Sequence, residues 1–259
     1  MTKWLFAEVS TCYDRSATTI TPPGRFLFQR IVDPVSTWAH NKVKLKKCPV
    51  NAPGAHFNQG RDMDSAFLKA LALARPDPGG GAAAAHRAAL GLALIEKVVR
   101  LEHQHRGPAR NPGFPWDDLL ARVSVVSAAL LRLQEEDVTA YSQFARARTQ
   151  GDPESLAAAL EEAVACPLRI MQQAQEGLVL MAQVGAGCGI HLISDLLVAC
   201  ELLGAAFRGA HHIARANLPF MRQDFKRAVW AEELTLTVSA IEAELLQVRA
   251  ELLRRQAYP

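Results

Sequence analysis

Asp137 is the residue whose position along the chain most clearly suggests chemistry. Leu130, Leu133, Tyr141 and Phe144 recur with it at steps of three or four, so the five side chains share one face of a helix. A carboxyl group on an apolar face loses water, which raises its pKa and suits it to proton transfer near neutral pH. The spacing leaves a second interpretation open, in which Asp137 pairs with a buried arginine and only joins helices.

A run of three glycines is the second feature with chemical potential. Gly79, Gly80 and Gly81 follow Pro76 and Pro78 and precede a run of alanines. Prolines and glycines of this kind predict a loop at 76–81, and the alanines predict a helix directly after it. Because a helix N-terminus has unpaired N–H groups and a partial positive charge, it favours anions. A plain linker ahead of a core helix is the alternative interpretation.

Further polar residues flank a later apolar helix, predicted at 195–218. Ser194 and Asp195 are typical of a helix start, with Ser194 as the N-cap and Asp195 in the positive first turn. Arg215 and Asn217 lie near its end. Arg215 can bind a carboxylate or pair with Asp137, and Asn217 can cap the helix or bind the edge of a heterocycle.

The elements that must position these groups are all helices. Apolar residues recur with helical spacing from residue 63 onward, and no segment alternates as a strand would. We therefore predict an all-α protein, an antiparallel bundle of five to six helices with an irregular N-terminal segment. The predicted helices are 64–74, 82–105, 116–148, 153–184, 195–218 and 222–256.

Local signals refine these helices. Asp152 and Pro153 predict a capped start at 153. Pro167 predicts a kink or a restart within 153–184. Loops are predicted from Gly107 to Pro115 and again around Gly185, Gly187 and Gly189. Small residues throughout 195–218 predict close approach of neighbouring helices.

The N-terminal quarter differs from the rest. Residues 1–62 lack periodicity and carry nine Lys/Arg against four Asp/Glu, whereas the remaining chain carries 20 against 22. We predict two segments, a basic irregular or disordered leader at 1–62 and a helical domain at 63–259. Met63 as the natural start is a hypothesis that mass spectrometry of the native protein would test, since abundant peptides from residues 1–60 would exclude it.

Composition narrows the functional class. The five cysteines show no metal or CxxC spacing, which indicates free thiols in a reducing, cytoplasmic compartment. No run of eighteen apolar residues lacks charge, so we expect no membrane partner. The basic balance belongs to the leader alone, so we expect no nucleic-acid partner either.

Four blocks in order resemble the cyclodeaminase/cyclohydrolase family, which includes the C-terminal domain of formiminotransferase-cyclodeaminase and stand-alone methenyltetrahydrofolate cyclohydrolases. The first runs from Phe67-Leu68 to Pro78-Gly79-Gly80-Gly81-Ala82-Ala83, and the second is Glu135-Glu136-Asp137-Val138-Thr139-Ala140-Tyr141. The third is Ala163-Val164-Ala165-Cys166-Pro167-Leu168. The fourth joins Ser194-Asp195-Leu196 to Ala214-Arg215-Ala216-Asn217-Leu218.

This resemblance implies an all-α homodimer that acts on folate one-carbon units, with tetrahydrofolate as carrier substrate and no other cofactor or metal. The expected enzyme is a methenyltetrahydrofolate cyclohydrolase or a formiminotetrahydrofolate cyclodeaminase, with Asp137 as the catalytic proton carrier. The expected substrate-binding residues are Gly79, Gly80 and Gly81 for an anionic part of folate, Arg215 for a second carboxylate, and Asp195 and Asn217 for the pterin.

The sequence departs from the family pattern at three positions, two of which support a competing class. Ala82 and Gly189 stand where the family has serine and asparagine, and Glu135 replaces the first aspartate of its block. The first two favour a non-catalytic dimeric scaffold or folate-binding protein that kept the fold. A metal-dependent hydrolase using the histidines at 103, 105, 211 and 212 is disfavoured, because these offer no i, i+4 ligand pair.

Overall fold

Five long helices build the part of the chain that the computed structural model describes, residues 65–110 and 113–257. They are α2 (Gly80–Arg110), α3 (Trp116–Gln150), α4 (Pro153–Gly187), α5 (Ile193–Asn217) and α6 (Asp224–Ala257). Two 3₁₀ turns, η2 (Ile190–Leu192) and η3 (Leu218–Phe220), flank α5, and residues 65–71 form a short helix. These ranges contain no strand, so the predicted all-α bundle is confirmed. The leader and its boundary at 62 lie outside the described residues.

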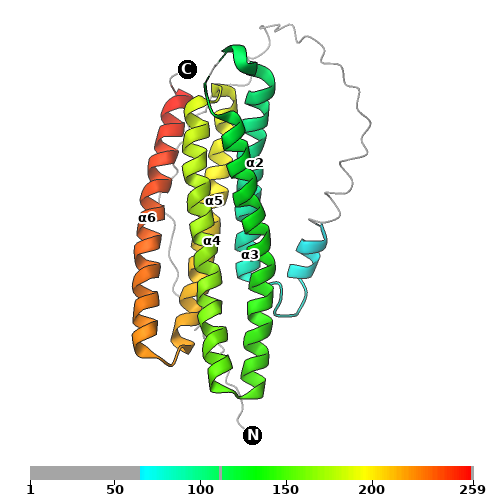
Figure 1. Ribbon diagram of the computed structural model, residues 1–259, viewed down its shortest axis with the longest axis vertical. Coiled ribbons are helices and arrows are strands. Elements are labelled where there is room, and N and C mark those ends of the chain that lie inside the picture. Colours follow the sequence, from blue (N-terminus) through cyan, green and yellow to red (C-terminus); the bar gives the residue numbers. More distant parts are fainter. Residues whose placement is uncertain (1–64, 111–112, 258–259) are drawn as a thin grey trace, which may run out of the picture. The chain divides into compact units, whose positions relative to one another are not determined.

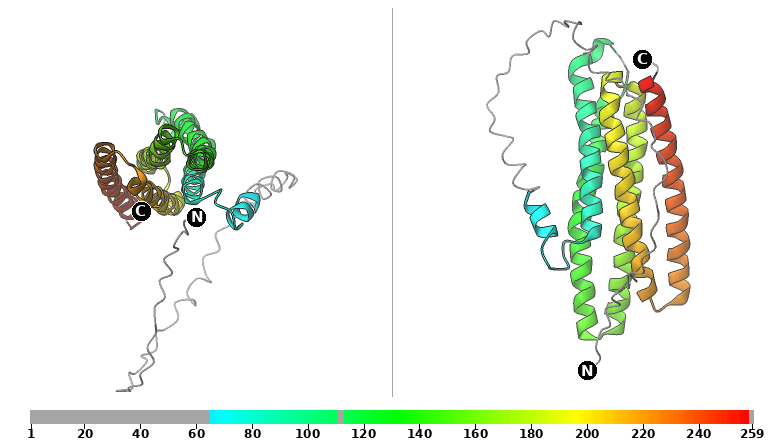
Figure 2. Two further views of the ribbon diagram at one scale, coloured as in Figure 1. Left: turned by 90° about the horizontal axis from the view of Figure 1, so that it is seen from below. Right: turned by 180° about the vertical axis from the view of Figure 1, so that it is seen from behind.

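The first four long helices form a four-helix bundle. α2 packs against α3 and α5, α4 packs against the same two helices, and α6 covers α4 and α5 (Figures 1 and 2). α5 is therefore enclosed on several sides, in contact with α2, α4 and α6. Its stretch Ile190–Phe220 is long and apolar enough to cross a membrane, but half of the apolar window is buried inside the protein. Core helices of bundles share that composition.

The two ends of the bundle are unequal. α2 starts at Gly80 opposite the middle of α3, and the hairpin of α3 and α4 extends beyond that start (Figures 1 and 2). The apolar face of α3 is consequently covered only in part. Leu130 and Leu133 are buried, Phe144 is half-buried, and Tyr141 is 42% exposed. Asp137 lies at the point where the cover by α2 ends.

Most predicted helices are confirmed within a few residues, but α2 is longer at both ends. The loop predicted at 76–81 is wrong for Gly80 and Gly81, which form the first turn of α2. A contact from outside the helix stabilises this first turn, because Asp137 accepts a hydrogen bond from the Ala82 N–H. The loop predicted from Gly107 begins later, because α2 continues to Arg110.

The signals around α4 have mixed outcomes. Asp152 is the N-cap as predicted, and its Oδ2 accepts a hydrogen bond from Ser155 N–H at 3.0 Å. α4 does not restart at Pro167 but continues through it. The loop predicted at the later glycines is wrong for Gly185 and Gly187, which lie inside α4.

Close packing explains these two glycines better than turn formation does. A Cβ on Gly185 would lie 2.8 Å from Leu252 Cδ2, and one on Gly187 would lie 2.3 Å from Phe114 Cζ. Ser194 is not an N-cap either. η2 continues directly into α5, which begins at Ile193 after Leu192 as the N-cap residue.

Candidate functional site

The carboxyl group of Asp137 lies at the N-terminus of α2. The Ala82 N–H donates a hydrogen bond to Asp137 Oδ2 at 2.8 Å, across 55 residues of sequence. Gly81 is essential to this approach, because a Cβ there would lie only 2.0 Å from Asp137 Oδ1. The two features that the sequence marked separately, the acid on an apolar face and the glycine run, therefore meet in one chain.

Burial and the helix end act in opposite directions on Asp137. Burial raises the pKa of its carboxyl group, and the hydrogen bond from the Ala82 N–H lowers it by a smaller amount. Within the described residues Asp137 makes no ion pair, so it is not the partner of a buried arginine. Because the pKa of Asp137 is raised and the hydrogen bond fixes only Oδ2, Oδ1 is available to exchange a proton.

The glycine run was expected to bind an anion, and the carboxyl group of Asp137 occupies this position. Asp137 takes the Ala82 N–H, which is one of the orphan donors of the first turn of α2. Gly79 and Gly80 are less enclosed than Gly81, since Gly81 is buried, Gly79 half-buried and Gly80 exposed. Their role in binding a folate anion remains a prediction.

His86 forms a second contact along the same seam between α2 and α3. It lies one turn after Ala82, and its Nδ1 is 3.2 Å from Oε1 of Gln134, one turn before Asp137. Its ring stacks on Phe67 from the short helix 65–71, with centroids 4.5 Å apart. Neither His86 nor Gln134 was predicted from the sequence, although both lie on the helix faces that carry Ala82 and Asp137.

Asn217 has a clear structural partner. Its Nδ2 donates to the carbonyl oxygen of Ala163 at 2.7 Å. In an uninterrupted α-helix that oxygen would accept from the N–H of residue 167, which proline lacks. Asn217 therefore replaces the missing hydrogen bond inside α4 and ties the end of α5 to it. The predicted helix cap is not formed by this side chain, and its contact with a pterin remains a prediction.

Arg215 lies at the same end of the bundle as the glycine run. Ile213, two residues earlier on α5, lies against Gly80, where a Cβ would be 2.8 Å from Ile213 Cδ1. Arg215 is exposed and forms no ion pair within the described residues, so it does not neutralise Asp137. The pKa of nearby His211 is lowered, first by burial and then by the charges of His212 and Arg215.

Asp195 is remote from this end. It lies in the first turn of α5, as predicted, and its Oδ2 pairs with Lys97 Nζ at 2.8 Å. Lys97 follows Ala82 by fifteen residues of α2, which is about 22 Å along a helix. Within one chain the structure does not bring Asp195 to Asp137, and a pterin contact from Asp195 stays a prediction that would require another copy of the chain.

Comparisons with known proteins identify the family and the fold. The family model described as formiminotransferase-cyclodeaminase matches residues 64–235. The chain belongs to this family. A crystal structure of formiminotetrahydrofolate cyclodeaminase from Thermotoga maritima is similar with a TM-score of 0.65 and 22% identity, over 72% of this chain and 93% of that one. At this identity the likeness shows the fold alone. A search of curated proteins gives no match.

One cluster of polar side chains near Asp137 was not identified from the sequence. Ligand atoms of Glu136, Glu162 and Cys166 lie within 4.8 Å of one another. Arg169 pairs with both glutamates, and burial, followed by the charge of Asp137, raises the pKa of Cys166 to about 12. Arg169 already pairs with both carboxylates and the thiol stays protonated, so this cluster is better suited to joining α3 and α4 than to holding a cation.

Of the four histidines considered for a metal site, those that the structure describes lie on two different helices. His103 Nε2 lies 3.2 Å from Asp117 Oδ1 near the far end of α2. His211 and His212 are neighbours on α5, with ring centroids 5.8 Å apart. The side chain of His105 lies outside the described residues.

Proposed function

We propose that this member of the formiminotransferase-cyclodeaminase family acts on the carbon that bridges N5 and N10 of tetrahydrofolate. It would be a methenyltetrahydrofolate cyclohydrolase or a formiminotetrahydrofolate cyclodeaminase. The observation that supports this most is the half-buried carboxyl group of Asp137, held by the first turn of α2 with one oxygen fixed. Family membership supports the folate substrate.

Both reactions need a group that moves a proton at a tetrahedral carbon. In the hydrolase, water adds to the methenyl carbon and gives one proton to Asp137. The hydroxyl group then loses its remaining proton and becomes the formyl carbonyl while the bond to one ring nitrogen breaks and this nitrogen gains a proton, so one proton is released overall. In the cyclodeaminase, N10 adds to the formimino carbon and loses its proton, and the imino nitrogen leaves as ammonia after protonation. We assign the proton transfers to Asp137, because its raised pKa brings both protonation states closer to neutral pH.

Substrate contacts follow from the same end of the bundle. Arg215 is an exposed arginine near the glycine run and suits a folate carboxylate, which it can bind with two parallel hydrogen bonds. We retain the homodimer, the cytoplasmic location and the absence of a cofactor beyond tetrahydrofolate as parts of this proposal. Light scattering coupled to size exclusion tests the dimer, and a monomer at all concentrations would contradict it.

The decisive experiment replaces Asp137 with asparagine. Methenyltetrahydrofolate absorbance follows the hydrolase, and ammonia release from formiminotetrahydrofolate follows the cyclodeaminase. We expect Asp137→Asn to lower kcat of the active reaction by at least about 100-fold, as for loss of a general acid–base. The matched control is Asp152→Asn, because Asp152 caps α4 and asparagine also caps.

Equal rates for wild type and Asp137→Asn would remove Asp137 from catalysis. Folate binding by a wild-type protein that turns over neither substrate would instead support the non-catalytic scaffold. Ala82→Ser is a further variant for the same activity assays, since it restores the hydroxyl group that the family has at this buried position.

A further inference from the structure

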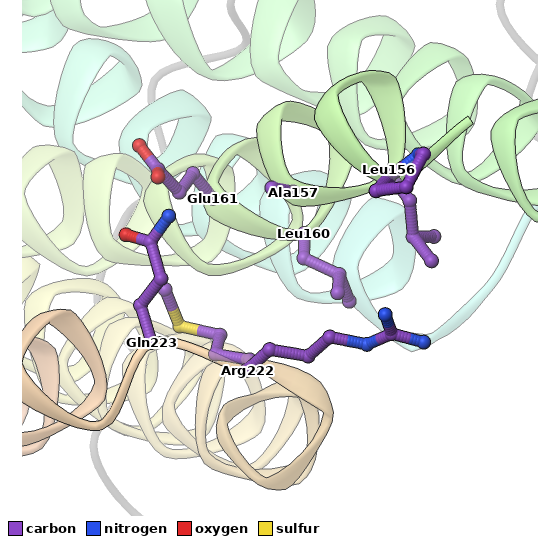
Figure 3. A pocket seen from close by; sticks show the side chains of 8 residues that line it. Leu156, Ala157, Leu160, Glu161, Arg222 and Gln223 are labelled. Atoms are coloured by element: carbon purple, nitrogen blue, oxygen red, sulfur yellow. The ribbon is translucent and has the colours of Figure 1, made fainter.

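A cavity lies where the start of α4 meets the turn between α5 and α6. It has a volume of about 200 Å³ and shares no lining residue with the Asp137 site. Figure 3 shows this pocket, whose eight lining residues come from two segments. They are Pro153, Leu156, Ala157, Leu160 and Glu161 from α4, and Met221, Arg222 and Gln223 from the turn.

The walls of the pocket are held in place by specific contacts. Asp152 caps the first turn of α4 through Ser155 N–H. Arg227 fixes the turn, since its Nη1 donates to the Met221 carbonyl oxygen at 3.2 Å and its Nη2 pairs with Asp224 at 2.6 Å. The pocket is therefore preformed, as small-molecule sites usually are.

The lining is mostly apolar and includes one charge, that of Arg222, for which the described part of the chain supplies no ion pair. Leu160 and Met221 are buried and form an apolar floor. Glu161 is neutralised by its ion pair with Lys226. Arg222 makes no ion pair within the described residues, and Figure 3 shows its side chain extended along Leu160 towards Leu156, opposite Glu161 and Gln223.

We propose that this pocket binds a small carboxylate with an aromatic or branched aliphatic body. The floor would take the apolar body, and the Arg222 guanidinium would hold the carboxylate through two parallel hydrogen bonds. Charge complementarity selects an anion, because Arg222 is the one lining charge that the described residues leave unbalanced. The volume selects a ligand about the size of benzoate, since drug-sized ligands occupy larger cavities.

The test uses 4-fluorobenzoate as the probe and fluorine NMR line broadening as the measurement, on the full chain. We expect saturable broadening that unlabelled benzoate reverses and that the uncharged 4-fluorobenzamide does not reproduce. Arg222→Gln should weaken binding roughly tenfold or more, because it removes a charge-assisted pair. Arg222→Lys should retain part of the affinity, and Arg132→Gln, at an exposed arginine of α3, should retain all of it.

A second pair of variants tests the cavity itself. Ala157→Leu fills the floor and should abolish binding, whereas Ala158→Leu, one residue further and exposed, should leave it unchanged. Both substitutions keep a good helix former, so stability is matched. Absence of saturable broadening in the wild type, or equal broadening in Arg222→Gln or Ala157→Leu, would overturn the proposal.

The source of the carboxylate is a separate arm of the same titration. Displacement of 4-fluorobenzoate by a stable reduced folate such as 5-formyltetrahydrofolate assigns the pocket to the carboxylate tail of a folate. Retention of 4-fluorobenzoate assigns it to a free small carboxylate. Either result supports a carboxylate site, and neither depends on turnover by Asp137.

Discussion

At the scale of single residues, Gly81 lies tightly against the carboxyl group of Asp137. Only hydrogen fits at the Cα of Gly81, because a Cβ would lie within 2.0 Å of one carboxyl oxygen and 2.5 Å of the carboxyl carbon. Those atoms belong to a side chain whose other oxygen is fixed by Ala82. The carboxyl group must therefore move if residue 81 gains a side chain.

Gly81→Ala should inactivate the protein without unfolding it. We expect a loss of turnover similar to that of Asp137→Asn, because the displaced carboxyl group loses both its position and the Ala82 hydrogen bond. Gly209→Ala is the matched control, since its Cβ would meet Ala84 Cβ at an ordinary 3.6 Å. Turnover measured for both variants checks this, and full activity of Gly81→Ala would show that the contact is not needed.

Asp137 should also reduce stability at neutral pH. Because its folded pKa is raised above the usual 3.8, the folded chain binds the proton more tightly than the unfolded chain does. Stability then falls as pH rises from 3.8 through the folded pKa, and it stays lowered above that window. An asparagine side chain in place of Asp137 would avoid the cost of the buried charge and could still accept the Ala82 hydrogen bond.

We therefore expect Asp137→Asn to have an equal or higher Tm than the wild type at pH 7, with the difference vanishing below pH 3.8. Thermal unfolding over a pH series measures it. Asp152→Asn is a control of opposite sign, because hydrogen bonds from Ser155 lower the pKa of Asp152 and its charge stabilises the helix above that pKa. A Tm of Asp137→Asn that falls at pH 7 but not at low pH would contradict the account.

Single residues also show what the sequence could predict of the site. The spacing around Asp137 predicted a partly buried acid, and the structure confirms its half-buried position. The contact with Gly81 spans more than fifty residues, so no local pattern encodes it. His86 was missed for the same reason, since its partners Gln134 and Phe67 are distant or in a separate helix.

At the scale of helices, α4 continues through Pro167 because another helix supplies the missing hydrogen bond. Asn217 at the end of α5 donates to the Ala163 carbonyl oxygen that proline leaves without its usual donor. Proline inside a helix otherwise costs about 3 kcal/mol or more. The block of Ala163 to Pro167 and the later Asn217 are thus parts of one contact.

A double-mutant cycle should detect that contact. Asn217→Ala leaves the Ala163 carbonyl oxygen without a donor and should lower the free energy of unfolding by about 1–3 kcal/mol. In the Pro167→Ala background, residue 167 regains its N–H and bonds Ala163 directly, so Asn217→Ala should cost much less. Urea unfolding of the four proteins measures the coupling. Equal costs in both backgrounds would show that Asn217 does not act through Pro167.

Helix boundaries show why local signals were only partly sufficient. Alanine content and 3.6-residue periodicity located the long helices, and Asp152 capped α4 as expected. The loop predicted at Gly185 and Gly187 was wrong because these glycines allow α4 to pack closely against Leu252 and Phe114. Those neighbours are far away in sequence, so tertiary packing overrides the local tendency of glycine to end a helix.

At the scale of the whole bundle, α2, α4 and α5 meet around Leu203. Leu203 is fully buried on α5 and lies against a glycine from each of the other two helices. A Cβ on Gly91 would be 3.1 Å from Leu203 Cγ, and one on Gly177 would be 3.2 Å from its Cδ atoms and 3.0 Å from Leu92 Cδ2. Glycines of α2 and α4 thus face a large side chain of α5 at this interface.

Leu203→Ala should lower the free energy of unfolding by about 2–5 kcal/mol, because it leaves a cavity where three helices meet. Leu236→Ala on α6 is the matched control, since Leu236 is 64% exposed and its loss should change stability by less than about 0.5 kcal/mol.

Gly177→Ala should cost about 1–3 kcal/mol alone through overpacking, and less in the Leu203→Ala background, where the added methyl group enters the vacated space. Chemical unfolding of the single and double variants measures this coupling. If the two costs simply add, the glycines are not what allows α2 and α4 to close on α5.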